Sequence, residues 1–458
     1  MNRLLKGALA IGGGALAAGA LRRAILAGSR PRYEPWERQP YHEFPNRVLI
    51  LGGGFAGYTA AKTLCRLTRH RDDVGVMLIS RENFFTFWPM LAGAISSDID
   101  TKNVAQPLRR ALIRDGASFR RAEVKAIDLE KRCVSADGQE FPYEHLIVAL
   151  GGEPAYFGIP GVEEHAISMT GIGTAEKIRN RVIERYEETT LSHEEVPRSK
   201  LTFVVIGGGA TGVETASELH ELIHDVLAPD YPNIDPYRTR IILVDRNEQV
   251  LKELDPALRR TARKKLADLE IQVISKVKAK EITANKVVLD DGREIETENA
   301  IWTAGARASE RLDDFDLPHD DRKGLEVDVY MRVEGHDDVW GVGDCAANVE
   351  KDGDPVPPNA QAATQEGRAV ARNVLAAIDG EELEPFDYKP LGQLVEMGSQ
   401  FAVNEVLGIK FSGLMAALFW RMTYLYKLES PQSRARIAAD WLLELFYDPA
   451  VTEIRGQE

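Results

Sequence analysis

The chain has 458 residues, of which 44 % are hydrophobic and 28 % are charged, and its formal net charge is −14. This balance is typical of a folded globular protein, and it excludes disorder, collagen and coiled coil as descriptions of the whole chain. The length predicts about three domains of roughly 150 residues each. The acidic charge argues against a nucleic-acid-binding protein, because phosphate recognition needs a clustered basic surface.

The chain has three cysteines, Cys65, Cys133 and Cys345, and no two of them form a C-x-x-C pair. Three cysteines at this spacing exclude a disulfide framework, a zinc ribbon, an iron–sulfur cluster and the usual redox-active disulfide. We therefore expect no metal site.

Residues 1–43 differ in character from the rest of the chain. A 15-residue apolar stretch, Gly7–Leu21, follows two basic residues and precedes Arg22 and Arg23. It is shorter than the roughly 20 residues of a membrane-spanning helix. Three interpretations stay open: a flexible or interfacial tail, a weak signal anchor, and a cleaved signal peptide. Residues 31–44, rich in proline and aromatic residues, predict a linker.

A glycine-rich turn opens the folded region. The apolar segment Arg47–Leu51 predicts a strand, and Gly52, Gly54 and Gly57 follow it as a G-x-G-x-x-G turn before the predicted helix Ala56–Thr68. The first glycine permits the tight turn, the second lets a pyrophosphate approach the backbone, and the third lets helix and strand pack closely. Free N–H groups at the helix N-terminus then face the phosphates.

The same pattern recurs about 155 residues later. The predicted strand Leu201–Ile206 leads into Gly207, Gly209 and Gly212, and a helix is predicted over Gly212–Leu227. One such turn is weak evidence, because glycine turns are common. Two, each between an apolar strand and a helix, predict two dinucleotide sites.

The residue after the next strand of each unit is a candidate for the adenosine ribose. Asp245 is placed to accept hydrogen bonds from a ribose 2′-hydroxyl, which favours NADH over NADPH. The first unit has Ser80 where an acid is expected, so we expect Ser80, Arg81 or Glu82 to hold that ribose.

Further candidate contacts follow short predicted strands. Gly151 and Gly305 each close such a strand, and Gly343 and Asp344 end a third one over 338–344. An aspartate at that point can bind a ribityl hydroxyl, while the glycine admits the backbone to a pyrophosphate. The helix predicted after Pro357 carries two glutamines, Gln361 and Gln365, one turn apart.

The C-terminal part is aromatic and locally basic. A helix predicted over Phe411–Leu428 carries an apolar face, and a second apolar stretch is Ile437–Tyr447. Five basic residues lie between 408 and 436: Lys410, Arg421, Lys427, Arg434 and Arg436. This combination suits a helix on an anionic membrane surface. The alternative, a core or dimer-interface helix, stays open.

These motifs together resemble the type II, non-pumping NADH:quinone oxidoreductases of the glutathione-reductase-like superfamily. The resemblance rests on ILGGGFAGYTAA, on the run Asn83–Leu91, on GGGATGVETASEL and on NAQAATQEG, and covers about residues 46–450. It implies an α/β protein with two Rossmann-like dinucleotide-binding domains. The FAD domain is discontinuous, the NADH domain is inserted into it, and an amphipathic helical C-terminal region associates with the membrane.

The resemblance also implies roles for residues. Non-covalent FAD is held at the first turn and Asp344, and NADH at the second turn and Asp245. Glu214 corresponds to a family glutamate near the flavin–nicotinamide junction, and Gln361 and Gln365 to paired glutamines that line the quinone pocket. Two departures are Ser80, where the family has an acid, and Thr364, where it often has His or Lys.

We expect five segments: a tail, anchor or linker (1–43), the first part of the FAD domain (44–165), the NADH domain (166–305), the second part of the FAD domain (306–385) and the membrane-associating region (386–458). The expected partners are a quinone and the lipid surface, at the cytoplasmic face of the cell membrane; a homodimer stays open. Two rival functions are a sulfide:quinone oxidoreductase, which needs a cysteine pair near the flavin, and a redox-sensing NADH-binding flavoprotein.

Overall fold

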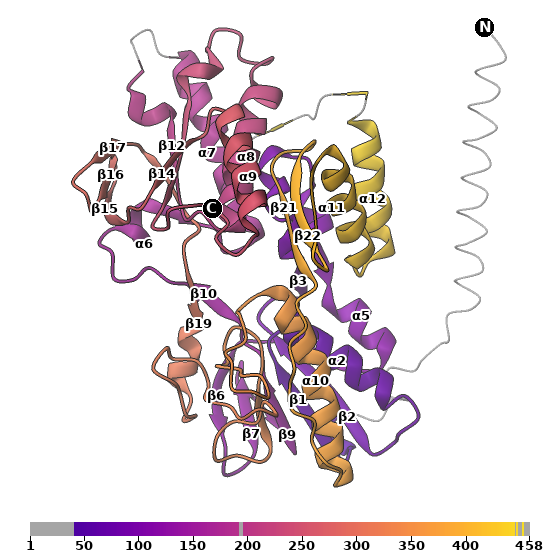
Figure 1. Ribbon diagram of the computed structural model, residues 1–458. Helices are drawn as coiled ribbons and strands as arrows, with labels where there is room; N and C mark the ends of the chain where they lie inside the picture. The colour runs from indigo at the N-terminus through magenta and orange to yellow at the C-terminus, as the bar shows by residue number, and fades with distance from the viewer. Residues whose placement is uncertain (1–40, 192–195, 445, 448–450, 453–458) are drawn as a thin grey trace, which may run out of the picture.

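The computed structural model describes residues 41–191, 196–444, 446–447 and 451–452. They form two α/β domains, one above the other in Figure 1, with a smaller C-terminal module beside both. Of the predicted N-terminal tail, anchor or linker, only the short turn η1 (Tyr41–Glu43) is described, and the rest lies outside the described residues.

The first domain is built on a five-stranded parallel sheet with the order β20-β9-β1-β2-β5. Its strands are β1 (Asn46–Leu51), β2 (Val74–Ser80), β5 (Ser118–Arg121), β9 (His145–Val148) and β20 (Val339–Gly341). Residues 48–51 of the central strand are fully buried, as expected for a parallel strand covered on both faces. Strand β20 joins this sheet only after the chain has passed through the second domain.

The second domain repeats this design. Its parallel sheet has the order β11-β18-β12-β13-β14. The strands are β11 (Ala166–Ser168), β12 (Thr202–Ile206), β13 (Arg240–Asp245), β14 (Gln272–Ser275) and β18 (Asn299–Trp302), and the helices are α7 (Ile172–Leu191), α8 (Ala210–Glu221) and α9 (Pro256–Asp268). The second predicted helix therefore begins at Ala210 and continues as the π-helix η4 (Leu222–Leu227).

An antiparallel pair of short strands, β10 (Gly152–Pro154) and β19 (Ala306–Ala308), joins the two domains. Each domain also carries a three-stranded antiparallel sheet. These are β6 (Val124–Asp128), β7 (Cys133–Ala136) and β8 (Gln139–Pro142) in the first, and β15 (Ala279–Thr283), β16 (Lys286–Leu289) and β17 (Glu294–Glu296) in the second. The predicted class, two Rossmann-like domains with the second inserted into a discontinuous first, is confirmed.

Short elements complete the first domain and the start of the second. They are β3 (Phe84–Thr86), α3 (Gly93–Ser96), α4 (Thr101–Val104), β4 (Ala105–Pro107), α5 (Leu108–Asp115) and α6 (Val162–His165). In this region the run Asn83–Leu91 forms an aromatic cluster: the ring centroids of Phe85 and Phe55 are 4.7 Å apart.

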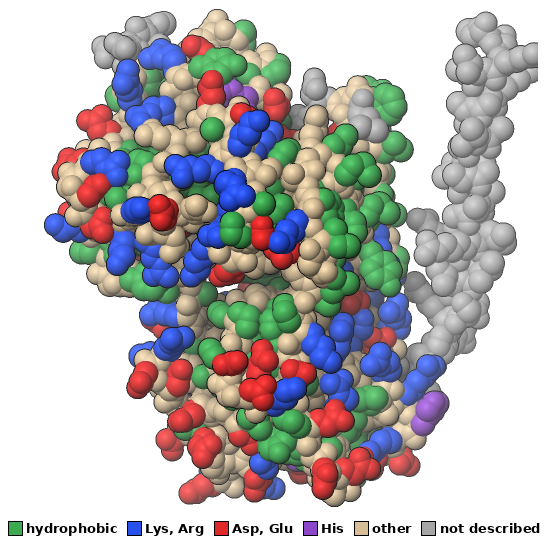
Figure 2. All heavy atoms as spheres, in the orientation of Figure 1, with side chains coloured by type: hydrophobic (Ala, Val, Ile, Leu, Met, Phe, Trp, Pro, Cys, Tyr) green, Lys and Arg blue, Asp and Glu red, His purple; other side chains and the backbone are tan. Residues whose placement is uncertain are grey.

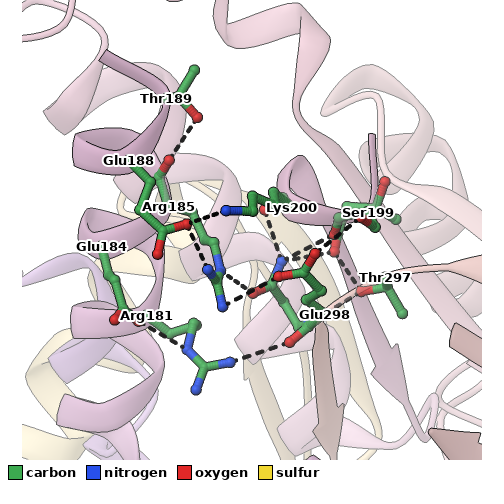
Figure 3. A network of polar contacts seen from close by, with 11 residues as sticks. Arg181, Glu184, Arg185, Glu188, Thr189, Ser199, Lys200, Thr297 and Glu298 are labelled. Carbon is green, nitrogen blue, oxygen red and sulfur yellow. Dashed lines mark hydrogen bonds and ion pairs between the residues drawn. The ribbon is translucent and has the colours of Figure 1, made fainter. Parts of the chain in front are cut away.

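A partly buried ionic network stabilises the second domain (Figure 3). Arg185 of α7 lies 2.7 Å from Glu188 and donates to Asn299 at the start of β18. Lys200, just before β12, forms an ion pair of 2.9 Å with the same Glu188. The network thereby fixes α7 against the two central strands of the sheet.

The C-terminal module consists of an antiparallel sheet and two helices. They are β21 (Gly392–Glu396), β22 (Ala402–Val406), β23 (Ile409–Gly413), α11 (Leu414–Lys427) and α12 (Pro431–Leu443). The prediction of one helix from Phe411 was wrong at its start, because Phe411 belongs to β23 and the chain turns at Gly413, whose φ is +87°. None of the described helices is long and apolar enough to cross a bilayer.

This module contacts both domains. Lys62 of α2 (Phe55–Leu67) forms an ion pair of 2.6 Å with Glu429, and Phe87 packs edge to face on Tyr424 of α11. On the other side, Lys410 lies 2.5 Å from Asp255, the residue that caps α9. The module therefore bridges the two domains at one edge of the molecule.

Helix α2 (Phe55–Leu67) packs against α10 (Ala360–Asp379), and the two backbones approach closely at a glycine. A Cβ atom on Gly367 would lie 2.3 Å from the carbonyl oxygen of Ala56 and 3.1 Å from the nitrogen of Ala60. Backbone atoms cannot move aside as a flexible side chain can. Gly367 therefore sets the spacing of this helix pair.

We expect Gly367→Val to lower the free energy of unfolding by at least about 1–3 kcal/mol, as overpacking of a core does. Thermal unfolding measures this. The control is Gly173→Val on α7, where an added Cβ meets open space and where we expect a change within about 0.5 kcal/mol. Equal melting of the two variants would contradict the role of Gly367.

Candidate dinucleotide and electron-transfer site

The first glycine turn has the geometry of a phosphate cradle. Gly52 has φ = +107°, and a Cβ atom there would lie 2.1 Å from the carbonyl oxygen of Ala149. A Cβ on Gly57 would lie 2.1 Å from the carbonyl oxygen of Gly52. These two glycines are therefore required by the fold itself.

Gly54 differs from its two neighbours. It caps the N-terminus of α2, no side chain caps that helix end, and an added Cβ would meet no atom within 4 Å. The space beside it is open, and the N–H groups of the first helical turn face it. An uncapped helix N-terminus with open space in front of it fits the pyrophosphate of a dinucleotide.

The second turn reproduces this arrangement. Gly207 has φ = +120°, a Cβ on Gly212 would lie 1.7 Å from the carbonyl oxygen of Gly207, and Gly209 again faces open space at an uncapped helix end. Thr303, which our sequence reasoning missed, supports this turn: its hydroxyl donates to the carbonyl oxygen of Ile206 at 3.0 Å. The structure therefore contains two similar cradles in one chain.

Asp245 is held rigidly beside the second cradle. Its two carboxylate oxygens accept hydrogen bonds from the backbone N–H groups of Gly208 (2.5 Å) and Asn247 (2.6 Å). A Cβ on Gly208 would lie 2.8 Å from the same carboxylate, so this glycine, also missed, is needed for the contact. At the corresponding point of the first domain, Ser80 is half-buried at the end of β2 and Arg81 is exposed.

Asp344 lies where the second part of the first domain returns to the first turn. It is half-buried, and burial raises the pKa of its carboxyl. Among the described residues it accepts no hydrogen bond, so it is available to a ligand. Its neighbour Gly343 has φ = +76° and donates its N–H to Glu366 at 2.5 Å.

Glu366 is a buried acid that our sequence reasoning passed over, although it stands next to Gln365 in the NAQAATQEG motif. Burial raises its pKa to about 7. Because it accepts from the backbone of Gly343, it fixes the Gly-Asp turn that presents Asp344. The open cradle at Gly54, the free carboxylate of Asp344 and this supporting acid together fit FAD.

The two glutamines of α10 hold a neighbouring segment. The Gln361 side chain accepts from the backbone N–H of Leu391 (2.7 Å) and from the Tyr388 hydroxyl (3.1 Å). The Gln365 amide exchanges two hydrogen bonds with the backbone of Lys389. Both glutamines therefore position the chain that leads into the C-terminal module, a contact that the sequence did not suggest.

Glu214 lies in the first turns of α8, close to the second cradle. Its Oε1 atom accepts from the backbone N–H of Glu396 in β21 at 3.4 Å. Burial raises the pKa of Glu214 to about 8. Of the sequence-predicted residues on α8, it is the one that meets the C-terminal module.

Comparison with known proteins assigns this arrangement to a class. The family model of the pyridine nucleotide-disulphide oxidoreductases matches residues 46–367. The chain belongs to this family. The match includes both cradles and the turn at Asp344.

Curated relatives define the family more narrowly. The type II NADH:quinone oxidoreductase Ndh of Mycobacterium tuberculosis is 31 % identical over 428 residues, covering 90 % of each chain. The demethylphylloquinone reductase NdbB of Synechocystis is 29 % identical, covering 86 % of this chain and 95 % of its own. Within the superfamily, the chain belongs to the type II NADH:quinone oxidoreductases.

Solved structures show the same fold. NDH2 from Plasmodium falciparum, in complex with NADH, superposes with a TM-score of 0.80 at 19 % identity, covering 88 % of this chain and 99 % of its own. A sulfide:quinone oxidoreductase from Aquifex aeolicus gives a TM-score of 0.68 at 20 % identity, covering 88 % and 96 %.

The two open cradles allow a reciprocal test. Gly54→Val places a branched side chain where the structure leaves space, so we expect a folded protein that loses its FAD absorbance. Gly209→Val is the matched control: we expect it to keep the flavin and to weaken NADH binding, measured as slower flavin bleaching at limiting NADH. Full yellow absorbance in purified Gly54→Val would remove the first turn from the FAD site.

Proposed function

We propose that this chain transfers a hydride from NADH to non-covalent FAD and then two electrons to a membrane quinone, without pumping protons. The observation that carries the proposal is the pair of open glycine cradles in a chain that matches type II NADH:quinone oxidoreductases over nine-tenths of its length. FAD supplies the redox chemistry by accepting the hydride and passing on the electron pair. The protein contributes binding, orientation and electrostatics.

Each candidate residue then has a task. Gly52, Gly54 and Gly57 hold the FAD pyrophosphate, Ser80 and Arg81 lie at its adenosine ribose, and Gly151, Gly343 and Asp344 line the ribityl side. NADH is held by Gly207, Gly209, Gly212 and Asp245, with Gly305 beside it. Glu214, Gln361 and Gln365 serve the electron-transfer centre, where the glutamines position the segment 388–392 at the quinone pocket. The proposed domain boundaries are those of the five segments predicted from the sequence: 1–43, 44–165, 166–305, 306–385 and 386–458.

NADH is the proposed donor. Asp245 presents an acidic group that is already held in place by two backbone N–H groups. A carboxylate accepts hydrogen bonds from a ribose 2′-hydroxyl and repels a 2′-phosphate.

The function is tested on purified protein. We expect a flavin spectrum that NADH bleaches and that a short-chain quinone restores, with steady-state quinone reduction much faster with NADH than with NADPH. A redox sensor would oxidise NADH slowly whichever quinone is added. Slow turnover with every quinone would therefore contradict the proposal.

Sulfide:quinone oxidoreduction is less well supported, because its cysteine pair is missing. Cys345 is buried, and burial raises the pKa of its thiol to about 12. Cys65 is buried in α2 with its pKa raised to about 12 as well, and Cys133 lies in β7, in the small sheet of the first domain. Reactive sulfur chemistry needs accessible thiolates.

We propose that the C-terminal module attaches the protein to the cytoplasmic face of the membrane, as a peripheral protein. Large hydrophobic side chains gather over α11 and α12, on the right-hand side of Figure 2. We call this the apolar patch; its exposed members are Leu414, Met415, Leu418, Phe419, Met422, Tyr426, Leu442, Leu443, Phe446 and Tyr447. A patch of this kind on a monomer marks a lipid or protein contact.

Two of the five basic residues between 408 and 436 are paired with acids of the protein and do not add positive charge beside the apolar patch. Arg421 points inward and lies 3.0 Å from the buried Asp98. Lys410 forms an ion pair with Asp255 of the second domain. The electrostatic part of membrane attachment therefore rests on Lys427, Arg434 and Arg436, each worth about 1 kcal/mol near an anionic surface. A homodimer through the same patch is the competing arrangement.

The patch can be tested without disturbing the fold. Met415 and Met422 are 72 % and 66 % exposed, so the double change Met415→Glu and Met422→Glu removes apolar burial of about 1.5–3 kcal/mol per side chain. In a chain that begins at residue 41, we expect this variant to lose flotation with anionic liposomes. Leu191→Glu, at the exposed end of α7, is the control. Flotation equal to that of the control would mark the patch as a protein contact.

A further inference from the structure

A group of buried and half-buried acids lies where the two domains and the C-terminal module meet. Three come from one face of α8, at successive turns: Glu214, Glu218 and Glu221. The others are Asp98, which follows α3, Glu396 of β21 and Glu444 at the end of α12. Glu218, Glu396 and Asp98 are each less than 8 % exposed.

Short contacts hold most of these acids in place. The Ser96 hydroxyl donates to the Glu218 carboxylate and accepts from the backbone N–H of Asp98 at 3.4 Å. Asp98 also accepts from the indole N–H of Trp441 at 3.2 Å. On α8, the Glu214 carboxylate accepts a hydrogen bond from the backbone N–H of Glu396. The Glu221 carboxylate accepts one from the backbone N–H of Ser399 at 2.7 Å.

Positive charge in this region is scarce. Arg421, stacked on the Trp441 ring, lies 3.0 Å from Asp98 and 3.8 Å from Glu396, and among the described residues it is the one cation paired with the group. Arg179 of α7 reaches the neighbouring Ser97 hydroxyl instead. Tyr424 of α11 and Asp225 of η4 also face the group, and neither adds positive charge.

Six acids beside one paired arginine cannot all be ionised in a buried place. Burial is the largest cause that raises the pKa of Glu214 to about 8 and that of Glu444 to about 9, and it raises the pKa of Glu218, Glu221 and Glu396 too. In addition, the Oε1 atom of Glu396 is buried without a hydrogen-bond partner and points toward Arg421. A carboxylate oxygen that lacks a hydrogen-bond partner at this position can take up and release a proton.

We propose that this group of acids conducts the proton that quinone reduction consumes, from Glu444 at the rim of the apolar patch through Asp98, Glu396 and Glu218 to Glu214. The inference rests on the proposed function. In NADH + H⁺ + quinone → NAD⁺ + quinol, one nicotinamide C–H bond breaks and two O–H bonds form. The electron pair and one hydrogen come from NADH. The second hydrogen is the proton H⁺, which the protein must take up from its surroundings.

The direction follows from the architecture. Glu444 is half-buried beside the exposed residues Leu442, Leu443 and Phe446. Glu214 is two residues from Gly212 of the second cradle, so the three acids of α8 lead from the interior toward the dinucleotide. Arg421 stabilises one ionised carboxylate in the middle of the route. This carboxylate can accept a proton, and the remaining carboxyls can then exchange protons in turn.

The test compares two electron acceptors in the same preparation. Ferricyanide takes electrons only, in NADH + 2 ferricyanide → NAD⁺ + H⁺ + 2 ferrocyanide, so it needs no proton from this route. We expect Glu218→Gln and Glu396→Gln, which keep the side-chain shape, each to lower the ratio of quinone to ferricyanide turnover at least tenfold. Glu184→Gln, a half-buried acid of α7 in the Figure 3 network, is the control that should keep the wild-type ratio.

Wild-type protein gives a second readout that no misfolded variant can confuse. We expect D₂O to slow quinone reduction by this protein more than its ferricyanide reduction. Ratios within twofold of wild type in both variants, or equal slowing of both acceptors by D₂O, would overturn the proton route while quinone reduction itself persists. Wild-type protein that reduces ferricyanide but no quinone would overturn the proposed function and the route together.

Discussion

The structure depends on one close contact, the packing of α2 against α10 at Ala56. Gly367 of α10 lies on the Ala56 carbonyl, and a Cβ on Gly343 would lie 3.2 Å from the Ala56 side chain. Segments about 300 residues apart in the sequence therefore meet on the first glycine turn. This contact closes a domain that the second domain interrupts, and it brings Asp344 to the same end of the sheet as the first cradle. Small residues are required because the two helix backbones touch.

The C-terminal module adds the third side of the site. It contacts α2, α8, Asp98 after α3 and the cap residue of α9, so it bridges the two dinucleotide domains at the junction where the acids lie. One face of α11 is buried against that junction through Trp420 and Arg421, and the opposite face forms the apolar patch. A single 14-residue helix thus links the proposed membrane surface with the proposed electron-transfer centre.

Much of the candidate site could be predicted because its signals are local. A glycine turn between a strand and a helix is encoded within about a dozen residues, so both turns could be predicted from their spacing. Asp245 was predicted from its place at the end of the next strand, although it lies further from its turn than is usual. The start of α11 was placed three residues too early, because Phe411 and the helix share an apolar pattern and only the bend at Gly413 separates them. Gly208, Thr303 and Glu366 were missed, since each matters through a contact with a residue distant in the sequence.

By itself the sequence determined two dinucleotide-binding units, their order along the chain and the aromatic, basic character of the C-terminus. These properties depend on glycine conformation, on the apolar periodicity of neighbouring residues and on composition. Only the tertiary structure decided that Gln361 and Gln365 bind the backbone of 389–392 and that Arg421 faces inward. It also decided that six acids from four separate segments share one buried place. The ionisation of a carboxyl depends on its burial and on the charges around it, and both are set by folding.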